Sequence, residues 1–433
     1  MLHDVSDGLR YLLDELARIA ALPLERGETL PARAYTDEDF HRLEHDRVFR
    51  GDWLCVGHVS QVARPGEYLR TEAAGEPLVV TRDEEGGLHA LSRVCRHRFM
   101  DILPPETTPE QGSLQRLMCP YHTWTYRLNG EYAGQLAGAP MMNKVDFDRA
   151  ACRLPRYRLE EWNGLLMVCA DPGVPPLAPQ LAELADRLAP YGLADLVVAY
   201  TDRWDGVPAN WKVGFENGSE NYHHMGTHAS TLDTLVPGKD TVVDESEGRW
   251  FSMYTPFALD GADPAAGGDA ADVPRVGTLI PGLGERELSG MTVAGFFPNL
   301  VMALLPDSVT FVRWVPTGPV THDALVTVLV PPQAERDPGF GAYVEASRRQ
   351  FEVIQNEDLV AVRGVQRGLA TDPAPSGGRF SHLERPLWQF QRYLADRLSA
   401  TAPKGQLAGT VRDVAPARGG RGQAAPRLTP GTR

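Results

Sequence analysis

The chain is poor in cysteine and has no long hydrophobic run. Among its 433 residues there are only five cysteines, and an odd, sparse set of this kind is not a disulfide framework. No segment approaches the roughly 18 apolar residues that a membrane span needs. The opening segment MLHDVSD also lacks the basic and apolar regions of a secretory signal. We therefore expect a protein of the reducing cytoplasm that has no membrane segment.

Basic residues are also in deficit. The 43 Lys and Arg residues are outnumbered by 57 Asp and Glu residues, which gives a formal net charge of −14. Nucleic-acid binding needs a basic surface, so this balance opposes a nucleic-acid partner. Hydrophobic residues make up 42% and charged residues 23% of the chain, and both values are typical of a soluble globular protein.

The N-terminal part of the chain changes from helical to strand-like spacing. Residues 1–48 show an amphipathic helical pattern over 6–20, and a second helix is expected to begin at Thr36. Residues 49–170 consist of short apolar segments between Gly and Pro turns, which predicts strands.

A Pro-rich connection at 171–180 separates these strands from a region of mixed elements. That region, 171–400, contains apolar strand segments and a long helix expected at 340–369. The small, acidic segment 259–275 is expected to be a mobile loop, and residues 401–433 are expected to be a disordered tail.

Two short motifs pair cysteine with histidine. Cys95-Arg-His97 is followed, after 21 further residues, by Cys119-Pro-Tyr-His122. These ligands suit zinc, and they also suit a Rieske [2Fe–2S] cluster, in which two Cys bind one iron and two His bind the other. The cluster is favoured because each motif supplies one Cys and one His after a predicted strand. The alternatives are a structural zinc site, or core cysteines with surface histidines. The remaining cysteines lack such partners and are expected to be small buried apolar residues: Cys55, Cys152 and Cys169.

A second group of histidines lies near the middle of the chain. His223, His224 and His228 fall within six positions, close behind Glu220. Two His and one carboxylate form the facial triad of non-haem Fe(II) oxygenases. Glu220 and His223 are three residues apart and are expected to share a helical face. His223 and His228 reach one metal only if the helix ends or bends between them, which Gly226 permits, and His224 points elsewhere.

The long predicted helix supplies the third ligand. Asp358 lies on its apolar stripe, whereas the neighbouring Glu357 lies off it. A carboxylate on a core-facing stripe is costly unless a cation or metal is beside it. The alternative partner is a buried arginine such as Arg363. The stripe itself is expected to consist of Val344, Phe351, Ile354, Val362, Val365 and Leu369.

Together these motifs resemble the catalytic subunits of Rieske non-haem iron oxygenases, the family of aromatic-ring-hydroxylating dioxygenases and related monooxygenases and demethylases. The resemblance covers about residues 40–398. Besides the metal motifs, it rests on Trp53…Gly57-His58, Asn210-Trp211-Lys212, Phe297-Pro298-Asn299 and Glu357-Asp358…Gln366-Arg-Gly368. It implies an α+β protein, with an N-terminal all-β Rieske domain and a C-terminal α+β catalytic domain that has an antiparallel sheet and a long C-terminal helix.

The resemblance also implies cofactors, ligands and partners. The [2Fe–2S] cluster would be held by Cys95, His97, Cys119 and His122. The catalytic Fe(II) would be held by His223, His228 and Asp358. Glu220 matches the family's bridging carboxylate, which links a cluster histidine of the neighbouring subunit to an iron histidine. Asn217 is a candidate to support that network, or else a capping or core residue. The expected partners are O2, a small-molecule substrate, an NAD(P)H-dependent reductase with or without a ferredoxin, and two further copies of the chain in a homotrimer.

Two departures from the family pattern bear on the substrate. The gap between the cluster motifs is longer than usual, which implies a larger loop around Pro104–Gln111. The bridging position is Glu220 where ring dihydroxylases have Asp. In the family, Glu at this position is associated with quaternary ammonium substrates such as carnitine and glycine betaine, which favours hydroxylation or demethylation of such a compound over cis-dihydroxylation of an aromatic ring.

Two other classes of protein remain possible from sequence alone. A Rieske electron-transfer protein needs only the strand-rich region and leaves the clustered histidines and Asp358 unexplained. A zinc protein would be colourless. For an oxygenase, aromatic residues between the iron motif and the long helix are candidates to line the pocket or to pack the core: Trp250, Phe251, Tyr254, Phe257, Phe296, Phe297 and Trp314.

Overall fold

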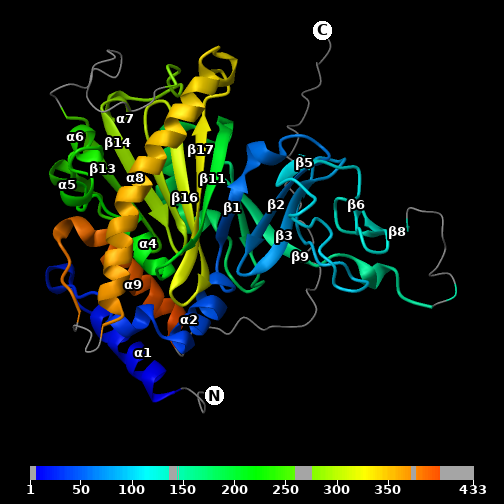
Figure 1. Ribbon diagram of the computed structural model, residues 1–433, viewed down its shortest axis with the longest axis horizontal. Helices are drawn as coiled ribbons and strands as arrows, with labels where there is room; N and C mark the ends of the chain where they lie inside the picture. The colour runs from blue at the N-terminus through cyan, green and yellow to red at the C-terminus, as the bar shows by residue number, and fades with distance from the viewer. Residues whose placement is uncertain (1–5, 136–143, 145, 259–275, 372–376, 400–433) are drawn as a thin grey trace, which may run out of the picture.

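A computed structural model describes most of the chain, namely residues 6–135, 144, 146–258, 276–371 and 377–399. The expected loop at 259–275 and the expected tail at 401–433 lie outside these residues. In the described part, two regions lie side by side (Figure 1). We call them the N-terminal β region, residues 54–169, and the C-terminal α+β region, residues 193–398.

The N-terminal β region contains two antiparallel sheets. A seven-stranded sheet has the order β1-β10-β9-β4-β3-β2-β5, and a three-stranded sheet has the order β6-β7-β8. The strands are β1 Leu54–His58, β2 Glu67–Ala73, β3 Glu76–Arg82, β4 Leu88–Ser92, β5 Gln111–Ser113, β6 Leu117–Met118, β7 Trp124–Tyr126, β8 Tyr132–Gln135, β9 Arg156–Trp162 and β10 Leu165–Cys169. The long loop expected around Pro104–Gln111 runs along β2, where the amide of Arg70 donates to the carbonyl of Glu110 at 2.7 Å.

The C-terminal α+β region is built on one antiparallel sheet of the order β11-β17-β16-β15-β14-β13-β12. Both faces of its central strands are buried, since nine of the ten residues of Thr321–Val330 are buried and alternate residues of Leu300–Leu304 pack into two different apolar clusters. Burial on both faces explains the near-continuous apolar runs in the sequence. The strands are β11 Val197–Val207, β12 Val242–Val243, β13 Trp250–Pro256, β14 Gly290–Phe296, β15 Leu300–Leu304, β16 Val309–Gly318 and β17 Thr321–Val330.

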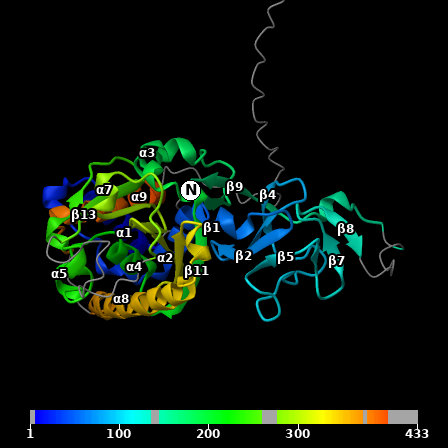
Figure 2. The same cartoon turned by 90° about the horizontal axis from the view of Figure 1, so that it is seen from above.

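Helices cover this sheet. The helix α8 (Phe340–Leu369) runs diagonally across one face, and Figure 2 shows it along one edge of the molecule when seen from above. The helix α3 (Ala182–Leu188) lies in the connection before this region. The other helices of the region are α4 Trp211–Gly218, α5 His224–Thr227, α6 Leu232–Leu235, α7 Glu285–Leu288 and α9 Arg385–Leu398.

The buried stripe of α8 differs from the predicted one. Val365 is 51% exposed, whereas Tyr343, Leu359 and Gln366 are buried. A helix of 3.6 residues per turn drifts relative to a straight row of apolar residues, so its buried face shifts along its length.

The N-terminal helices pack against the end of the chain. In α1 (Asp7–Ala20) the leucines are buried in the same core as α9, and Trp388 Nε1 of α9 donates to the carbonyl of Leu22 at 2.8 Å. The second helix, α2 (Glu38–Glu44), begins two residues later than expected, because the Asp37 side chain accepts from the amides of Asp39 and Phe40 and caps it.

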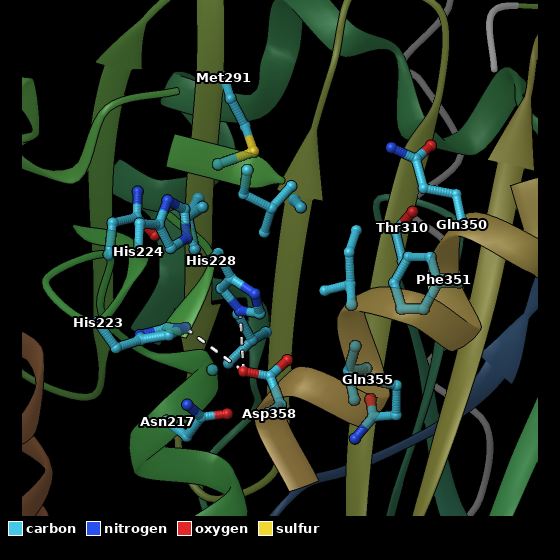
Figure 3. Close-up of a pocket in the computed structure, with 18 of the residues that line it drawn as sticks. Asn217, His223, His224, His228, Met291, Thr310, Gln350, Phe351, Gln355 and Asp358 are labelled. Carbon is cyan, nitrogen blue, oxygen red and sulfur yellow. Dashed lines mark hydrogen bonds and ion pairs between the residues drawn. The ribbon is translucent and has the colours of Figure 1, made fainter. Parts of the chain in front are cut away.

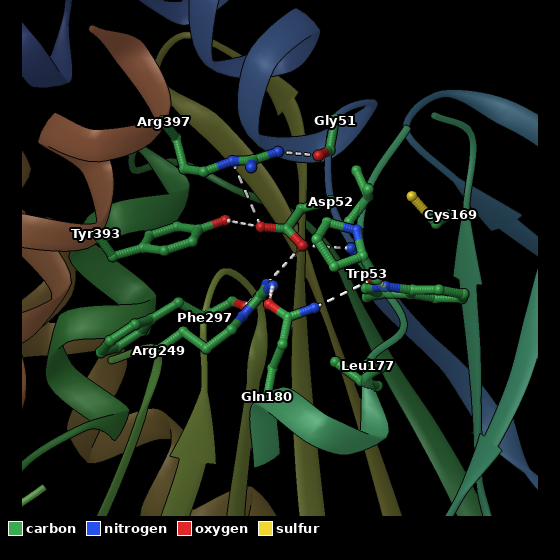
Figure 4. Close-up of polar contacts among 12 residues, drawn as sticks. Gly51, Asp52, Trp53, Cys169, Leu177, Gln180, Arg249, Phe297, Tyr393 and Arg397 are labelled. Atoms are coloured by element: carbon green, nitrogen blue, oxygen red, sulfur yellow. Dashed lines mark hydrogen bonds and ion pairs between the residues drawn. The ribbon is translucent and has the colours of Figure 1, made fainter. Parts of the chain in front are cut away.

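A buried carboxylate joins the two regions. Asp52, just before β1, is fully buried and pairs with Arg249 Nη2 at 2.5 Å and with Arg397 Nε at 3.5 Å (Figure 4). Tyr393 of α9 donates to the same carboxylate at 2.9 Å. Removing one partner of such a group leaves an uncompensated buried charge, so these contacts restrain the β1 end of the N-terminal region against β13 and α9.

The architecture confirms the predicted α+β fold class, with an all-β region first and a mixed region carrying the antiparallel sheet and a long helix second. Of the helices described, none combines the length and the apolar character needed to cross a membrane.

Candidate metal centres and substrate cavity

The two Cys–His motifs form loops of the same shape. The amide of Cys95 donates to the carbonyl of Met100, and the amide of Phe99 donates back to Cys95; Cys119 makes the same two bonds with Trp124 and Thr123. The fifth residue of each loop has a left-handed backbone, with φ of 61° at Phe99 and 59° at Thr123. Such strain in non-glycine residues persists where the surroundings enforce it, as at ligand-holding loops.

The two loops place histidine next to histidine and cysteine next to cysteine. The imidazole rings of His97 and His122 lie 4.6 Å apart between centroids. Burial first, and also the neighbouring Cys95 thiol, raise the pKa of the Cys119 thiol. Both cysteines are buried, whereas both histidines are partly exposed. This pairing fits a Rieske cluster, in which the two buried cysteines would hold one iron and the two partly exposed histidines would hold the other.

The polar atoms of these loops fit a bound cluster. Nδ1 of His97 is buried and makes no hydrogen bond to any residue that the structure describes. Burial first, and then the neighbouring His122 and Arg98, lower the pKa of His97, which keeps the ring in the neutral form that binds metal. The Tyr126 hydroxyl lies 3.3 Å from the Cys95 sulfur and accepts from the amide of Arg96 at 3.0 Å, so it braces the first loop.

The other cysteines largely match their expected structural role. Cys55 and Cys169 are buried, and Cys152 is only partly buried. Burial raises the pKa of Cys55 to about 11 and that of Cys169 to about 12, so neither is a thiolate at neutral pH.

A second potential metal site forms where α5 meets α8. One ligand atom from each of His223, His228 and Asp358 lies within 4.8 Å of the others. Nε2 of His228 is 3.0 Å, and Nε2 of His223 is 3.5 Å, from the same oxygen of Asp358 (Figure 3). The structure therefore brings together three residues that are up to 135 positions apart in the sequence. Arg363, the alternative partner of Asp358, is exposed instead.

Each of the two histidines is held by a different carboxylate. Nδ1 of His223 lies 2.7 Å from Glu220, and Nδ1 of His228 lies 2.7 Å from Glu357. Burial would lower the pKa of His228, but Asp358 and Glu357 raise it. A carboxylate on Nδ1 fixes the ring and leaves Nε2 available for a metal. The donor set and its surplus of negative charge thus fit a divalent iron.

Glu357 was missed by sequence reasoning. Because Glu357 lies off the predicted apolar stripe, the sequence pattern assigns it no role at the metal site. Its side chain also accepts from Thr231 at 2.7 Å, so it ties α8 to the turn after α5. The one available signal was its position next to Asp358.

The local backbone around the histidines differs from the predicted helix. The helix α4 ends at Gly218, and Glu220 reaches His223 across a turn rather than along a helical face. His223 caps the start of the short helix α5 and His228 caps its end. The bends therefore fall at these two residues and not at Gly226. At the end of α4, the buried Ser219 hydroxyl donates to the Phe215 carbonyl at 2.6 Å.

His224 and Asn217 lie beside the site. His224 Nδ1 contacts the carbonyl of Val236 at 3.1 Å, away from Asp358 as expected. Asn217 lines the adjoining cavity, and no hydrogen bond joins it to Glu220 within the described residues.

The segment before the histidines is anchored by buried charges. Lys212 Nζ lies 2.8 Å from Glu44, and both side chains are fully buried. Trp211 Nε1 donates to the same carboxylate at 3.1 Å. One turn further along α4, the Tyr35 hydroxyl donates to Glu216 at 2.8 Å. The N-terminal helices therefore hold the helix that leads into the metal site.

A cavity of about 230 Å³ adjoins the three potential ligands. It lies between α4, α8 and the sheet, and most of its lining surface is apolar. Of the seven aromatic candidates from the sequence, only Trp314 lines it. Five of the others are buried in the core, as Phe251, Phe296 and Phe297 illustrate, and Tyr254 is only partly buried. Alternate residues on a strand face opposite sides of the sheet, so only some of them face the cavity.

Two family models match the chain. The Rieske [2Fe–2S] domain matches residues 52–153, and the ring hydroxylating alpha subunit (catalytic domain) matches residues 193–400. Together they account for most of the chain, which therefore belongs to the Rieske non-haem iron oxygenases. The cofactors of these two domains are a [2Fe–2S] cluster and a mononuclear Fe(II). The electron-transfer and zinc alternatives are thereby set aside.

Curated relatives include several oxygenase subunits. The glycine betaine monooxygenase oxygenase subunit of Chromohalobacter salexigens is 28% identical over 87% of this chain and 88% of its own length. The carnitine monooxygenase oxygenase subunit of Escherichia coli is 32% identical over 52% of this chain and 58% of its own length. The benzene 1,2-dioxygenase subunit alpha of Pseudomonas putida is 30% identical over 71% of this chain and 62% of its own length.

Solved structures share the fold. A quaternary ammonium Rieske monooxygenase has a TM-score of 0.72 at 23% identity, covering 88% of this chain and 98% of its own. Naphthalene 1,2-dioxygenase from Rhodococcus sp. has a TM-score of 0.74 at 22% identity, covering 92% and 100%. One fold thus serves both kinds of oxygenase.

Proposed function

We propose that the chain is the oxygenase component of a system that draws electrons from NAD(P)H through a reductase, with or without a ferredoxin, and uses O2 to hydroxylate or demethylate a small organic substrate in the cytoplasm. One observation carries the proposal. A single chain brings two Cys–His loops of the same shape together and, separately, forms a His–His–Asp group that adjoins an apolar cavity.

The residues take distinct roles in this proposal. Cys95, His97, Cys119 and His122 hold the cluster; His223, His228 and Asp358 hold the mononuclear iron. When bound, the cluster supplies one-electron transfer and the iron supplies activation of O2. Glu220 and Glu357 orient the two imidazoles by accepting from Nδ1–H. The aliphatic lining of the cavity keeps water from the reacting end.

The domain limits follow the same assignment. The segment 1–48 packs on the catalytic domain, 49–170 is the Rieske domain, 171–400 is the catalytic domain, and 401–433 is a tail. The proposal for the first segment is supported by the contacts of α1 with α9 and of Glu44 with Lys212.

We further propose that electrons pass between subunits of a homotrimer. Figures 1 and 2 both place the β6–β8 sheet and α5 at opposite ends of one chain, so a path within one chain would be long. Exposed apolar side chains flank both ends: Phe99, Met118 and Tyr121 near the cluster, and Tyr222 and Met225 near the histidines. Head-to-tail contacts in a closed ring would bring the two surfaces together, with Glu220 as the bridge to His223.

We also propose two candidate classes of substrate. Names of relatives, together with Glu220, support a quaternary ammonium compound and its monooxygenation. The relative acting on benzene supports ring cis-dihydroxylation as the second candidate.

Metal analysis and oxygen uptake test the proposal together. The purified protein should contain about three irons and two acid-labile sulfides per chain. Incubated with a reductase and NADH, it should consume O2 when the right member of a panel of betaines and arenes is added. A colourless protein that binds zinc, or an iron-loaded protein that no compound in the panel stimulates, would contradict the proposal.

A further inference from the structure

The cavity has two chemically different ends. Figure 3 shows His223, His228 and Asp358 at one end, and Thr310 of β16 with Gln350 of α8 at the other. The rest of the lining combines aliphatic side chains with further uncharged polar ones. Gln355, which Figure 3 labels, and Ser347 are among the polar residues. The aliphatic residues include Leu232, Val293, Val301, Val312, Ile354 and Val362.

No cationic side chain of the Lys or Arg type is among the described residues that line the cavity. The carboxylates there are Glu220 and Asp358, and both already contact imidazoles. Away from the proposed iron ligands, a substrate carboxylate would therefore lose its hydration without gaining an ion pair. Burying an unpaired carboxylate is strongly unfavourable. The lining thus opposes the anionic half of a betaine.

The aromatic side chains do not form a cage for a quaternary ammonium group. A cage needs several ring faces within about 6 Å of one cation. Tyr343 and Phe351 are eight residues apart on α8, which separates them by roughly 12 Å along the helix axis. Trp314 packs edge-on against Phe215, with centroids 5.5 Å apart. The lining thus opposes the cationic half of a betaine as well.

The far end offers uncharged hydrogen-bonding groups. The side chains of Gln350 and Thr310 make no hydrogen bond to any described residue, although both line the cavity. An amide and a hydroxyl can meet an alcohol, a carbonyl or an amide without needing a charge. An unmet polar group at the wall of an apolar cavity favours a ligand that satisfies it.

We infer that the cavity selects an uncharged molecule with a compact aliphatic or aryl body and one hydrogen-bonding group, which Thr310 and Gln350 receive at the end remote from the histidines. The inference rests on the proposed function for the identity of the reacting end. It decides between the two substrate classes proposed above in favour of the uncharged one.

Matched probes isolate the effect of charge. The metal-loaded protein is titrated calorimetrically with two isosteric pairs: choline against 3,3-dimethyl-1-butanol, and glycine betaine against 3,3-dimethylbutanamide. Benzyl alcohol and toluene form a third pair, which tests the hydrogen-bonding group. We expect each uncharged isostere to bind at least about tenfold more tightly than its charged partner. The free-energy cost of desolvating an unpaired charge exceeds the free energy that corresponds to a tenfold difference in affinity. Equal or tighter binding of choline or glycine betaine overturns the inference, as does the absence of binding by every uncharged probe.

Variants of α8 test the receiving group. Gln350→Leu should weaken benzyl alcohol binding about fivefold, the usual effect of one neutral hydrogen bond, and leave toluene unchanged. Asn356→Leu, an amide on the exposed side of the same helix, is the matched control and should change neither. Gln350→Glu keeps the size of the side chain and should improve choline binding. Equal effects of Gln350→Leu and Asn356→Leu overturn the role of Gln350.

Iron and sulfide contents of the same preparation separate this inference from the proposed function. A protein that holds both metals and binds only the charged probes refutes the inference and leaves the oxygenase assignment intact. A protein that binds the uncharged probes but holds no iron refutes the oxygenase assignment alone.

Discussion

The cluster loops and the iron segment both use histidine, but they are built in opposite ways. The proposed cluster ligands come from two loops of the same shape that lie 21 residues apart, and their histidines are partly exposed. The proposed iron ligands come from the two ends of α5 and from α8, and His228 is only 1% exposed. A site that receives electrons from a partner needs an exposed edge, whereas a site for O2 and substrate needs to exclude water.

The supports of the two sites differ as well. At the cluster, backbone hydrogen bonds within each loop and Tyr126 hold the ligands. At the iron site, Glu220 and Glu357 each hold one imidazole, and the buried pair of Glu44 and Lys212 holds the preceding helix. A locally built site tolerates changes elsewhere, and a site assembled from distant segments depends on them.

The largest effect is expected from removing a cluster thiolate. Cys119→Ala should abolish the visible colour and all NADH-dependent turnover, because a cluster iron loses one of its two protein ligands. The mononuclear iron should remain, since its ligands belong to the other region. Absorption spectra and metal analysis measure both, and Cys152→Ala is the control. Loss of both metals would show that the two sites are not independent.

Next in size is the removal of the iron carboxylate. Asp358→Ala should keep the cluster spectrum, lose the mononuclear iron and lower turnover by more than about a hundredfold. Glu357→Gln should retain iron with an affinity lowered by roughly tenfold to a hundredfold, as for other carboxylates that orient a metal-bound histidine. Iron content after dialysis against a chelator is the measurement. The reverse order of the two variants would reassign the ligand to Glu357.

A smaller effect is expected at the link between the sites. Glu220→Gln should leave both metals bound and slow cluster reoxidation by about tenfold, because it removes the charge that orients His223 while keeping the shape. A single-turnover experiment measures this effect. The cluster is reduced, substrate and O2 are added, and the rate of cluster reoxidation is compared with the amount of product formed. Wild-type kinetics would exclude Glu220 as the bridge, and an active monomer would exclude the route between subunits.

The smallest effect concerns stability beneath the iron segment. Burial raises the pKa of Glu216 to about 7, from an ordinary value of 4.5. The protonated carboxyl therefore favours the folded state below about pH 4.5, and this contribution is lost as pH rises through 7. It amounts to something on the order of 3 kcal/mol.

Glu216→Gln, which stays neutral, should raise the melting temperature by a few degrees at pH 8 and change it little at pH 5. Melting curves at both pH values measure this, with Glu352→Gln on the exposed side of α8 as the control. An equal shift at both pH values would exclude titration of Glu216 as the cause.

Spacing within short segments predicted much of the molecule. The Cys–His motifs, the long helix and the apolar strands depend on neighbours within a few residues, so the family and the fold class could be recognised and are confirmed. Asp358 could be chosen over Glu357 because a carboxylate on an apolar stripe needs a partner. The structure places Asp358, and not Glu357, at Nε2 of both histidines.

Only the tertiary structure decided the contacts between segments that are far apart in the chain. Local spacing suggested a helix through Glu220 and His223, but the contacts of Ser219 and the packing of α4 end that helix at Gly218. Periodicity could not say that Glu357 contacts His228, because that contact depends on how α8 crosses the sheet. Nor could it separate Trp314 from the other aromatic residues, since a strand residue faces cavity or core according to sheet packing. Sequence determines which side chains are available, and the packing of helix on sheet determines which of them meet.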